Sequence, residues 1–209
     1  MGELKLWNNA EDALKEALKR KKMKYKIKED EGAFYGPKID FHIKDSLDRE
    51  WQLATVQIDF QLPERFELSY TGEDGKQHKP VIIHRAIYGS LERFMGILVE
   101  HYKGKFPVWL SPVQAIVLPI SDDNVKYAEK ILNELKRNNI RAEIDSETST
   151  LENKIRNVQL QKLPYMLIVG KKEEANKSIA VRTSDGKTKF DVKVEDFVNS
   201  VQNYIKNFK

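Results

Sequence analysis

The chain has 209 residues, 40% of them hydrophobic and 33% charged, a composition that excludes a disordered polymer and fits one large or two ordinary folded domains. It has no cysteine, which excludes disulfides and thiolate ligands for zinc, and no apolar run approaches the roughly 18 residues of a membrane span. A net charge of +4 permits a polyanionic partner without requiring one. The first residues lack the pattern of a signal peptide, so we expect a cytoplasmic protein without a membrane anchor.

The first hundred residues predict a helix, an antiparallel sheet and a second helix. Apolar residues recur at helical spacing over 9–20, where Asn9 is the expected N-cap. Residues 24–86 hold short alternating runs that predict strands, namely "YKIK", "KIDFHIKD", "WQLATVQIDF", "FELSYT" and "PVIIHRA", and "TGEDGKQ" predicts a hairpin connection. From Ser90 to Tyr102 the spacing is helical again.

The stretch "GKFPVWLSP" interrupts regular structure and predicts a boundary between domains 1–110 and 111–209. Beyond it, strands and helices alternate: "VQAIVLPI", a helix over 123–138, "IRAEID", a helix over 150–162, "YMLIVG", a hairpin around "TSDGKT" and a final helix from about residue 194. Strands that are apolar on both faces are typical of parallel strands covered by helices. We therefore expect an α+β domain followed by a small three-layer α/β domain with mostly parallel central strands.

Residues 19–28, "KRKKMKYKIK", hold seven basic residues in ten. Such a run is typical of a solvated helix end and an edge strand, and it also suits contact with nucleic-acid phosphates. The sequence leaves both interpretations open.

Three stretches carry polar side chains that suit a ligand site. In "EGAFYGPKIDF", two bends bring a phenol, Tyr35, and an ammonium, Lys38, near one another, although a turn with a surface lysine gives the same pattern. In "REWQLATVQIDFQLP", Gln52 and Gln57 are five apart, so a regular strand puts them on opposite faces and only a bulge or a wrapped strand end brings them together.

The third stretch is "VIIHRAIYGSLERF", in which a strand is expected to end on His84 before a helix that Ser90 can cap. A neutral imidazole at a sheet edge is a good metal ligand, and a lone histidine is also often structural. Arg93, in the first turn of that helix, adds a planar guanidinium to an anion-binding helix end.

Taken together and in order, "EGAFYGPKIDF", "WQLATVQIDFQLPERF", "HRAIYGSLERFMGILVEH" and "FPVWLSPVQ" resemble the C-terminal part of the threonyl-tRNA synthetase family. In that family "HRAIYGSLERF" resembles motif 3 of class II aminoacyl-tRNA synthetases. The part that follows "SPVQ" looks like the anticodon-binding domain.

The resemblance implies a threonine–tRNA ligase that uses ATP and Mg²⁺ to form threonyl-adenylate and passes threonine to tRNA. Groups that bind ATP are then Gln52, Gly89, Ser90 and Arg93, and groups that bind threonine are Tyr35, Lys38, Gln57 and His84. Within these sets Arg93 and Lys38 are the expected catalytic residues. His84 becomes one of three protein ligands of a Zn²⁺ ion that recognises threonine, and Asp122, Glu173 and Arg182 become the anticodon contacts.

The chain also departs from the family pattern. It begins between motifs 2 and 3, so the other two zinc ligands and the other ATP-binding motifs are absent, and we expect a C-terminal portion that is inactive alone. Glu147, Thr148 and Thr150 stand where the family has a basic, asparagine-containing loop, which weakens the expected affinity for the anticodon. The full-length family implies a homodimer.

Two other interpretations stay open. One is a free-standing tRNA-binding or accessory protein derived from a synthetase, which binding to threonine tRNA with an unaltered and an altered anticodon would test. The other is a globular α+β protein without a ligand.

Overall fold

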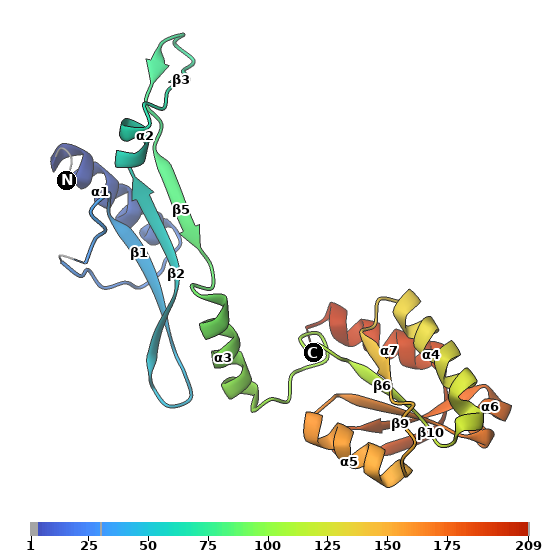
Figure 1. Ribbon diagram of the computed structural model, residues 1–209. Helices are drawn as coiled ribbons and strands as arrows, with labels where there is room; N and C mark the ends of the chain where they lie inside the picture. Colours follow the sequence, from blue (N-terminus) through green and yellow to red (C-terminus); the bar gives the residue numbers. More distant parts are fainter. Residues whose placement is uncertain (1–3, 30, 209) are drawn as a thin grey trace. The chain divides into compact units, whose positions relative to one another are not determined.

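The structure is a computed structural model that describes residues 4–29 and 31–208. The chain divides into two compact units, Met1–Leu98 and Val99–Lys209, which are described separately here as the first and the second unit (Figure 1). Among the described residues, no helix is both long and apolar enough to cross a bilayer.

The first unit is built on a three-stranded antiparallel sheet in the order β1-β2-β5, with α1 beside β1 (Figure 1). A two-stranded hairpin, β3–β4, and the short helix α2 lie between β2 and β5 in the chain. The elements are α1 (Leu4–Arg20), β1 (Lys38–Lys44), β2 (Glu50–Asp59), α2 (Gln61–Arg65), β3 (Tyr70–Thr71), β4 (Gln77–His78), β5 (Ile82–Ala86) and α3 (Leu91–Tyr102), the last of which continues into the second unit.

The antiparallel sheet of the first unit confirms the α+β prediction, but the local structure departs from the prediction in several places. Helix α1 already includes Leu4, so Asn9 lies inside the helix and does not cap it. The run "YKIK" alternates like a strand, yet residues 23–28 belong to no strand among the described residues. Helix α2 was not predicted; its first backbone N–H groups, those of Gln61 and Leu62, donate to the carboxylate of Asp59.

The second unit contains a five-stranded sheet in the order β10-β9-β8-β6-β7. Strand β6 runs parallel to both β7 and β8, and β9 is antiparallel to β8 and to β10. The strands are β6 (Ala115–Pro119), β7 (Ala142–Ile144), β8 (Tyr165–Val169), β9 (Ser178–Thr183) and β10 (Thr188–Lys193), and the helices are α4 (Val125–Arg137), α5 (Leu151–Gln161), α6 (Lys171–Asn176) and α7 (Val194–Lys206).

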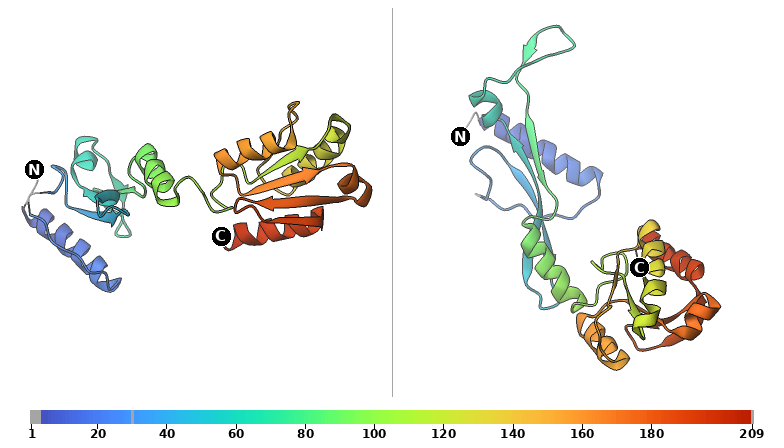
Figure 2. Two further views of the ribbon diagram at one scale, coloured as in Figure 1. Left: turned by 90° about the horizontal axis from the view of Figure 1, so that it is seen from below. Right: turned by 45° about the vertical axis from the view of Figure 1, so that its right-hand side comes forward.

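Helices cover both faces of this sheet and form three layers. On one face, Ala128, Ile131 and Leu135 of α4 recur at helical spacing and pack with α7 against the sheet. On the other face, Val158 of α5 packs against Leu118 of β6 (Figure 2, left, where α5 is orange and α7 red). All five residues of β6 are buried, as expected for a central parallel strand, so the predicted α/β domain is confirmed.

The two units differ in how much apolar surface they bury. Nearly all buried apolar side chains belong to the second unit, whereas the apolar side chains buried in the described part of the first unit are those of Ala10, Leu53 and two prolines, Pro37 and Pro63. Several large apolar side chains of the first unit are instead exposed, among them Ile83 at 66% and Met95 at 62%. A monomeric protein exposes single apolar residues routinely, but this number in one small unit is typical of a surface that contacts more polypeptide.

Candidate functional site

The register of the first sheet places a row of polar side chains on one face. Lys38 of β1 pairs with Gln57 of β2, and Gln57 pairs with His84 of β5. Residues directly opposite one another in a sheet point to the same side. Lys38, Gln57 and His84 therefore lie side by side across three strands, although they are far apart in the sequence.

A β-bulge brings Gln52 to this same face. Phe41 pairs with Ala54 and His42 pairs with Gln52, so that Leu53 has no partner in β1. Because the bulge takes up one extra residue, the side chain of Gln52 points to the same face as that of Gln57, although the two are five residues apart. This is the geometry that the five-residue spacing of the two glutamines requires if they are to converge.

Tyr35 lies over Gln57 and His84 because the bend before β1 is held close to β2. Its hydroxyl donates to Gln57 Oε1 at 2.8 Å, and its ring centroid is 5.9 Å from that of His84. The bend depends on Gly36, since a Cβ there would lie 1.8 Å from the carbonyl oxygen of Ile58. A glycine is needed here for close backbone approach, whatever its dihedral angles.

A charged network occupies the middle of the face. Lys38 Nζ lies 2.5 Å from Asp40, whose other oxygen accepts hydrogen bonds from Gln52 Nε2 at 2.6 Å and Thr55 Oγ1 at 2.7 Å. Burial raises the pKa of Asp40, but the hydrogen bonds from Lys38, Thr55 and Gln52 outweigh it and hold the pKa below its usual value. The network therefore keeps an ionised carboxylate, and with it a fixed lysine, at neutral pH.

His84 is paired with a carboxylate that is fully buried. His84 Nε2 lies 2.9 Å from Asp59 Oδ2, and Asp59 has no exposed surface. Burial raises the pKa of Asp59, but the hydrogen bonds from Leu62 N–H, His84 and Gln61 N–H outweigh this effect and keep the pKa below its usual value. The prediction that the strand ends on His84 is wrong, because β5 continues to Ala86 as the partner of Thr55.

The residues present do not form a zinc site by themselves. No group of three His, Cys, Asp or Glu side chains able to hold a metal occurs within residues 4–29 and 31–208. Asp59 already accepts backbone hydrogen bonds with one oxygen and faces His84 with the other. A protein zinc site needs three or four donors, so this chain offers His84 at most as one of them.

The start of α3 supplies the remaining candidate residues. Ser90 caps the helix by accepting from the backbone N–H of Arg93 at 3.3 Å, as expected. Arg93 Nη2 donates to the backbone carbonyl of Gln52 at 2.8 Å, which ties the helix to β2. Gly89 has φ +66°, and a Cβ there would lie 3.0 Å from the carbonyl oxygen of Leu53 and 3.1 Å from Arg93 Nη2. The predicted phosphate-binding residues thus adjoin the bulge.

Three residues of this face were not predicted: Asp40, Thr55 and Asp59. Asp40 is two positions after Lys38, a spacing that puts both on one face of a strand, and this signal was present in the sequence. Thr55 and Asp59 take their importance from pairing with other strands, which local sequence does not report.

In the second unit, Asp122 lies beside a cavity of about 210 Å³ at the carboxyl ends of β6 and β7. Glu147 and Thr148 line the same cavity, and the buried ammonium of Lys154 lies in its wall. Lys154 Nζ donates to the backbone carbonyl of Asp145 at 2.9 Å, so it holds the end of β7. Carboxyl ends of parallel strands, next to strands whose connections diverge, are the usual binding edge of α/β sheets.

Of the other two predicted anticodon contacts, Glu173 lies near this edge and Arg182 lies further along the sheet. Glu173 Oε2 accepts from the backbone N–H of Gly170, directly after β8. Arg182, on β9, pairs with Met166 and donates to Thr188 Oγ1 at 3.2 Å, and its Nε is buried without a hydrogen-bond partner. No hydrogen bond or ion pair joins Arg182 to Asp122 or Glu173 among the described residues.

Thr150, the third of the residues that depart from the family pattern, has a structural role. Its hydroxyl accepts a hydrogen bond from Asn153 N–H at 3.3 Å and caps α5.

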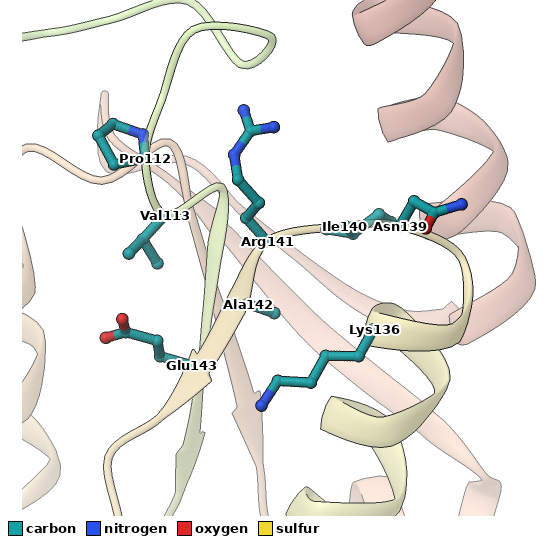
Figure 3. Close-up of a pocket in the computed structure, with 8 residues that line it drawn as sticks. All are labelled: Pro112, Val113, Lys136, Asn139, Ile140, Arg141, Ala142 and Glu143. Carbon is teal, nitrogen blue, oxygen red and sulfur yellow. The ribbon is translucent and has the colours of Figure 1, made fainter.

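A second hollow, of about 390 Å³, lies at the opposite ends of β6 and β7 (Figure 3). Its charged groups come from Lys136, Glu143 and Arg141. Arg141 is already engaged, because its guanidinium donates to the carbonyl oxygens of Ser111 at 2.9 Å and Trp109 at 2.8 Å. We therefore assign a structural role to this end of the sheet, where Arg141 holds the segment before β6. The candidate site is assigned to the carboxyl ends of β6 and β7.

Comparisons with known families match both units. Residues 4–102 match the tRNA synthetase class II core domain of the G, H, P, S and T enzymes, and residues 114–204 match the anticodon binding domain. The boundary predicted after residue 110 falls between the two matched ranges.

Whole-chain relatives are similar along nearly the full sequence. The chain is 52% identical over 199 residues to a threonine–tRNA ligase of Desulfatibacillum aliphaticivorans, covering 95% of this chain and 31% of the relative. It is also 52% identical over 205 residues to a threonine–tRNA ligase of Thermotoga petrophila, covering 98% of this chain and 32% of the relative. The chain thus spans about a third of the length of the curated relatives it matches.

Solved structures agree with the sequence comparisons. The RNA binding domain of threonyl-tRNA synthetase from Cryptosporidium parvum Iowa II superposes with a TM-score of 0.87 at 40% identity, covering 98% of this chain and 52% of that one. A putative threonyl-tRNA synthetase from Aeropyrum pernix gives a TM-score of 0.70 at 31% identity, covering 99% and 51%. From the matched domains, the relatives and the shared fold together, we conclude that the chain belongs to the class II aminoacyl-tRNA synthetases, and among them to the threonyl-tRNA synthetase family.

Proposed function

We propose that this chain contributes one wall of the aminoacylation site and the anticodon-reading domain of a threonine–tRNA ligase. The observation that carries the proposal is that one face of the first sheet collects the residues expected at threonine and ATP, in a chain about half identical to threonine–tRNA ligases over both units. The reaction is formation of threonyl-adenylate from threonine and ATP, followed by transfer of threonine to tRNA.

On the ATP side, Arg93 and the N-terminus of α3 would hold the triphosphate. Arg93 is exposed, and among the residues that the structure describes its guanidinium donates only to the carbonyl oxygen of Gln52, so its other N–H groups can donate to phosphate oxygens. Ser90 and Gly89 flank it, and the absence of a side chain at Gly89 lets a nucleotide approach. Mg²⁺ would neutralise charge on the phosphates when ATP is bound.

On the amino-acid side, Tyr35, Gln57 and His84 would surround threonine, and Lys38 would lie beside the carboxylate or adenylate. The contact between Tyr35 and Gln57 orients both groups before a substrate arrives, which reduces the entropy cost of binding. We propose His84 as one zinc ligand of a site that further residues of the ligase complete, and Asp59 would fix the orientation of its ring.

In the second unit, Asp122, Glu173 and Arg182 would contact the anticodon. Carboxylates and guanidinium groups can hydrogen-bond the exposed edges of unstacked bases, the usual way in which single-stranded RNA loops are recognised. The partners are then tRNA for threonine, threonine and ATP, in the cytoplasm and in a homodimer of the complete ligase. The exposed apolar residues of the first unit, such as Ile83 and Met95, support contact with the rest of a synthetase core.

A chimera tests the catalytic part. Replacing the matching 32% of the Thermotoga petrophila ligase with this chain should preserve threonine-dependent ATP–pyrophosphate exchange. Arg93→Ala in the chimera should lower exchange by about 100-fold or more, because a donor to transition-state charge is lost. Arg137→Ala, an exposed arginine of the second unit, is the matched control. Near-normal exchange by the Arg93 variant would refute the assignment.

A second candidate is an accessory tRNA-binding protein, which is favoured by the contrast between the well-buried core of the second unit and the sparse core of the first. Binding of the chain to threonine tRNA, compared with the same tRNA carrying an altered anticodon, tests the second unit independently of adenylate formation. Anticodon discrimination together with an inactive chimera would favour this second candidate.

A further inference from the structure

The net positive charge of the chain is due to one short segment, residues 19–28, called the basic segment. The whole chain has 36 basic and 32 acidic residues, and the basic segment contains seven of the former and none of the latter. Outside it, 29 basic residues face 32 acidic ones, a net charge of −3. The basic segment alone therefore makes the net charge of the protein positive.

The structure leaves the basic segment open to solvent. Helix α1 ends at Arg20, the backbone of Met23 still bonds back to Leu18, and residues 24–29 enter no helix or strand. Every residue from Lys19 to Glu29 is exposed.

Few of these charges are neutralised within the protein. Arg20 pairs with Glu16, and Lys28 lies 3.3 Å from Glu31. Within the described ranges, no carboxylate lies within 4 Å of the five other ammonium groups, those of Lys19, Lys21, Lys22, Lys24 and Lys26. Like charges this close repel one another and destabilise the free protein, and a polyanion would relieve that repulsion.

Apolar side chains alternate with the lysines in the second half of the segment. Met23, Tyr25 and Ile27 are exposed at 43%, 39% and 65%. A tyrosine ring offers a nucleobase a face to stack on, while neighbouring lysines contact the phosphates. Alternation of cations with an aromatic residue is typical of binding to a nucleic-acid strand.

We propose that the basic segment binds the phosphate backbone of RNA without regard to sequence, as a second RNA contact separate from the anticodon edge. Glu11, Asp12 and Glu16 on α1 disfavour an anionic membrane, which would have to lie along the helix as well as the segment. A nucleic-acid strand is narrow enough to follow the segment alone. The inference rests on the proposed function in one respect, which is the choice of RNA as the polyanion that the basic segment binds.

The test is the salt dependence of RNA binding. The triple variant Lys21→Gln, Lys24→Gln and Lys26→Gln is compared with an equal loss of charge at three exposed lysines elsewhere in the first unit, Lys44→Gln, Lys76→Gln and Lys79→Gln. Fluorescence anisotropy with labelled threonine tRNA, at salt concentrations from about 50 to 300 mM, gives the slope of log K against log salt. Each lysine that neutralises a phosphate contributes roughly 0.7–0.9 to that slope.

We expect the slope to fall by about 2 in the first triple variant, with an affinity loss of roughly tenfold to 100-fold at 100 mM salt, and to change by less than about 0.5 in the control. Equal slopes for the two variants, or no RNA binding at all at 50 mM salt, would overturn the proposal. So would unchanged RNA binding together with lysine-dependent binding to phosphatidylserine vesicles.

The same experiment, repeated with threonine tRNA that carries an altered anticodon, distinguishes this proposal from the proposed anticodon contacts. The ratio of the affinities for tRNA with the unaltered and the altered anticodon should be the same for the unmodified chain and for both triple variants. The reason is that the basic segment contacts only the RNA backbone. If none of the proteins discriminates, the anticodon assignment fails while the slopes still decide the role of the basic segment.

Discussion

Replacing Gln114 by leucine should destabilise the second unit although the side chain touches no candidate site. Gln114 is fully buried immediately before β6. Its Nε2 donates to the carbonyl oxygen of Val108 at 2.8 Å, and its Oε1 accepts from the backbone N–H of Arg141 at 2.9 Å. One amide thus fastens the segment before β6 to the start of β7.

The size of the effect follows from these two bonds. Leucine has nearly the same volume but leaves Val108 O and Arg141 N without their partner, at about 1–3 kcal/mol for each buried group. Burial of the more apolar leucine offsets about 1 kcal/mol of this. The net loss should be about 1–5 kcal/mol, which lowers the melting temperature of a domain of this size by roughly 4–20 °C.

Hydrogen exchange followed by mass spectrometry measures this loss in the second unit alone, within the intact chain. Amides of β6 should exchange about 5-fold to 5,000-fold faster in Gln114→Leu than in the unmodified protein. The matched control is Gln159→Leu on the exposed side of α5, which should change stability by less than about 0.5 kcal/mol. If β6 amides exchange at similar rates in both variants, the fastening role assigned to Gln114 is refuted.

Two further predictions concern glycine packing and acid sensitivity. Gly36→Ala should disrupt the pairing of β1 with β2, because its Cβ would lie 1.8 Å from Ile58 O, and should speed amide exchange throughout the first sheet. Gly96→Ala, with nothing within 4 Å of the new Cβ, should instead stabilise α3 by about 1 kcal/mol in the same assay. The Thr183 hydroxyl, with Lys187, lowers the pKa of Asp185 from 3.8 to about 2, so its contribution to the β9–β10 hairpin should be complete above about pH 4 and disappear as the pH falls towards 2. NMR shifts of the hairpin amides should show that transition, and Asp185→Asn should remove it.

The second unit was largely predictable because its signals are local. Strand β6 is an unbroken apolar run, and α4 repeats apolar residues at three and four positions. These patterns depend on burial within a single element, so each can be recognised without knowing its neighbours. Helix α6 escaped prediction because its six residues include no apolar face.

The polar face of the first unit could be predicted only in part. Tyr35 and Lys38 were identified from the bend that positions them, but the charged partner Asp40 was not, since an acidic residue in a strand usually faces solvent. The hydrogen bonds of the buried Asp59 come from His84, which the register of β5 brings beside β2, and from the first N–H groups of α2. Such long-range pairing leaves no periodic trace in either segment.

The segment "YKIK" shows the opposite error. Its alternation is genuine, but a strand needs a neighbour for its backbone hydrogen bonds, and the structure provides none to residues 24–28 among those described. Alternating lysines and apolar residues instead make an exposed charged segment.

The bulge at Leu53 links the direction of the Gln52 side chain to the length of β2. Without Leu53 the two glutamines would be four residues apart, an even spacing that a regular strand places on one face, and His42 would still pair with Gln52. Closing the bulge while keeping Leu53 would instead pair His42 with Leu53 and turn Gln52 and every residue before it in β2 to the opposite face. The length of this strand and its bulge should therefore change together, and a related sequence that is one residue shorter here should form a regular β1–β2 ladder with the same polar face.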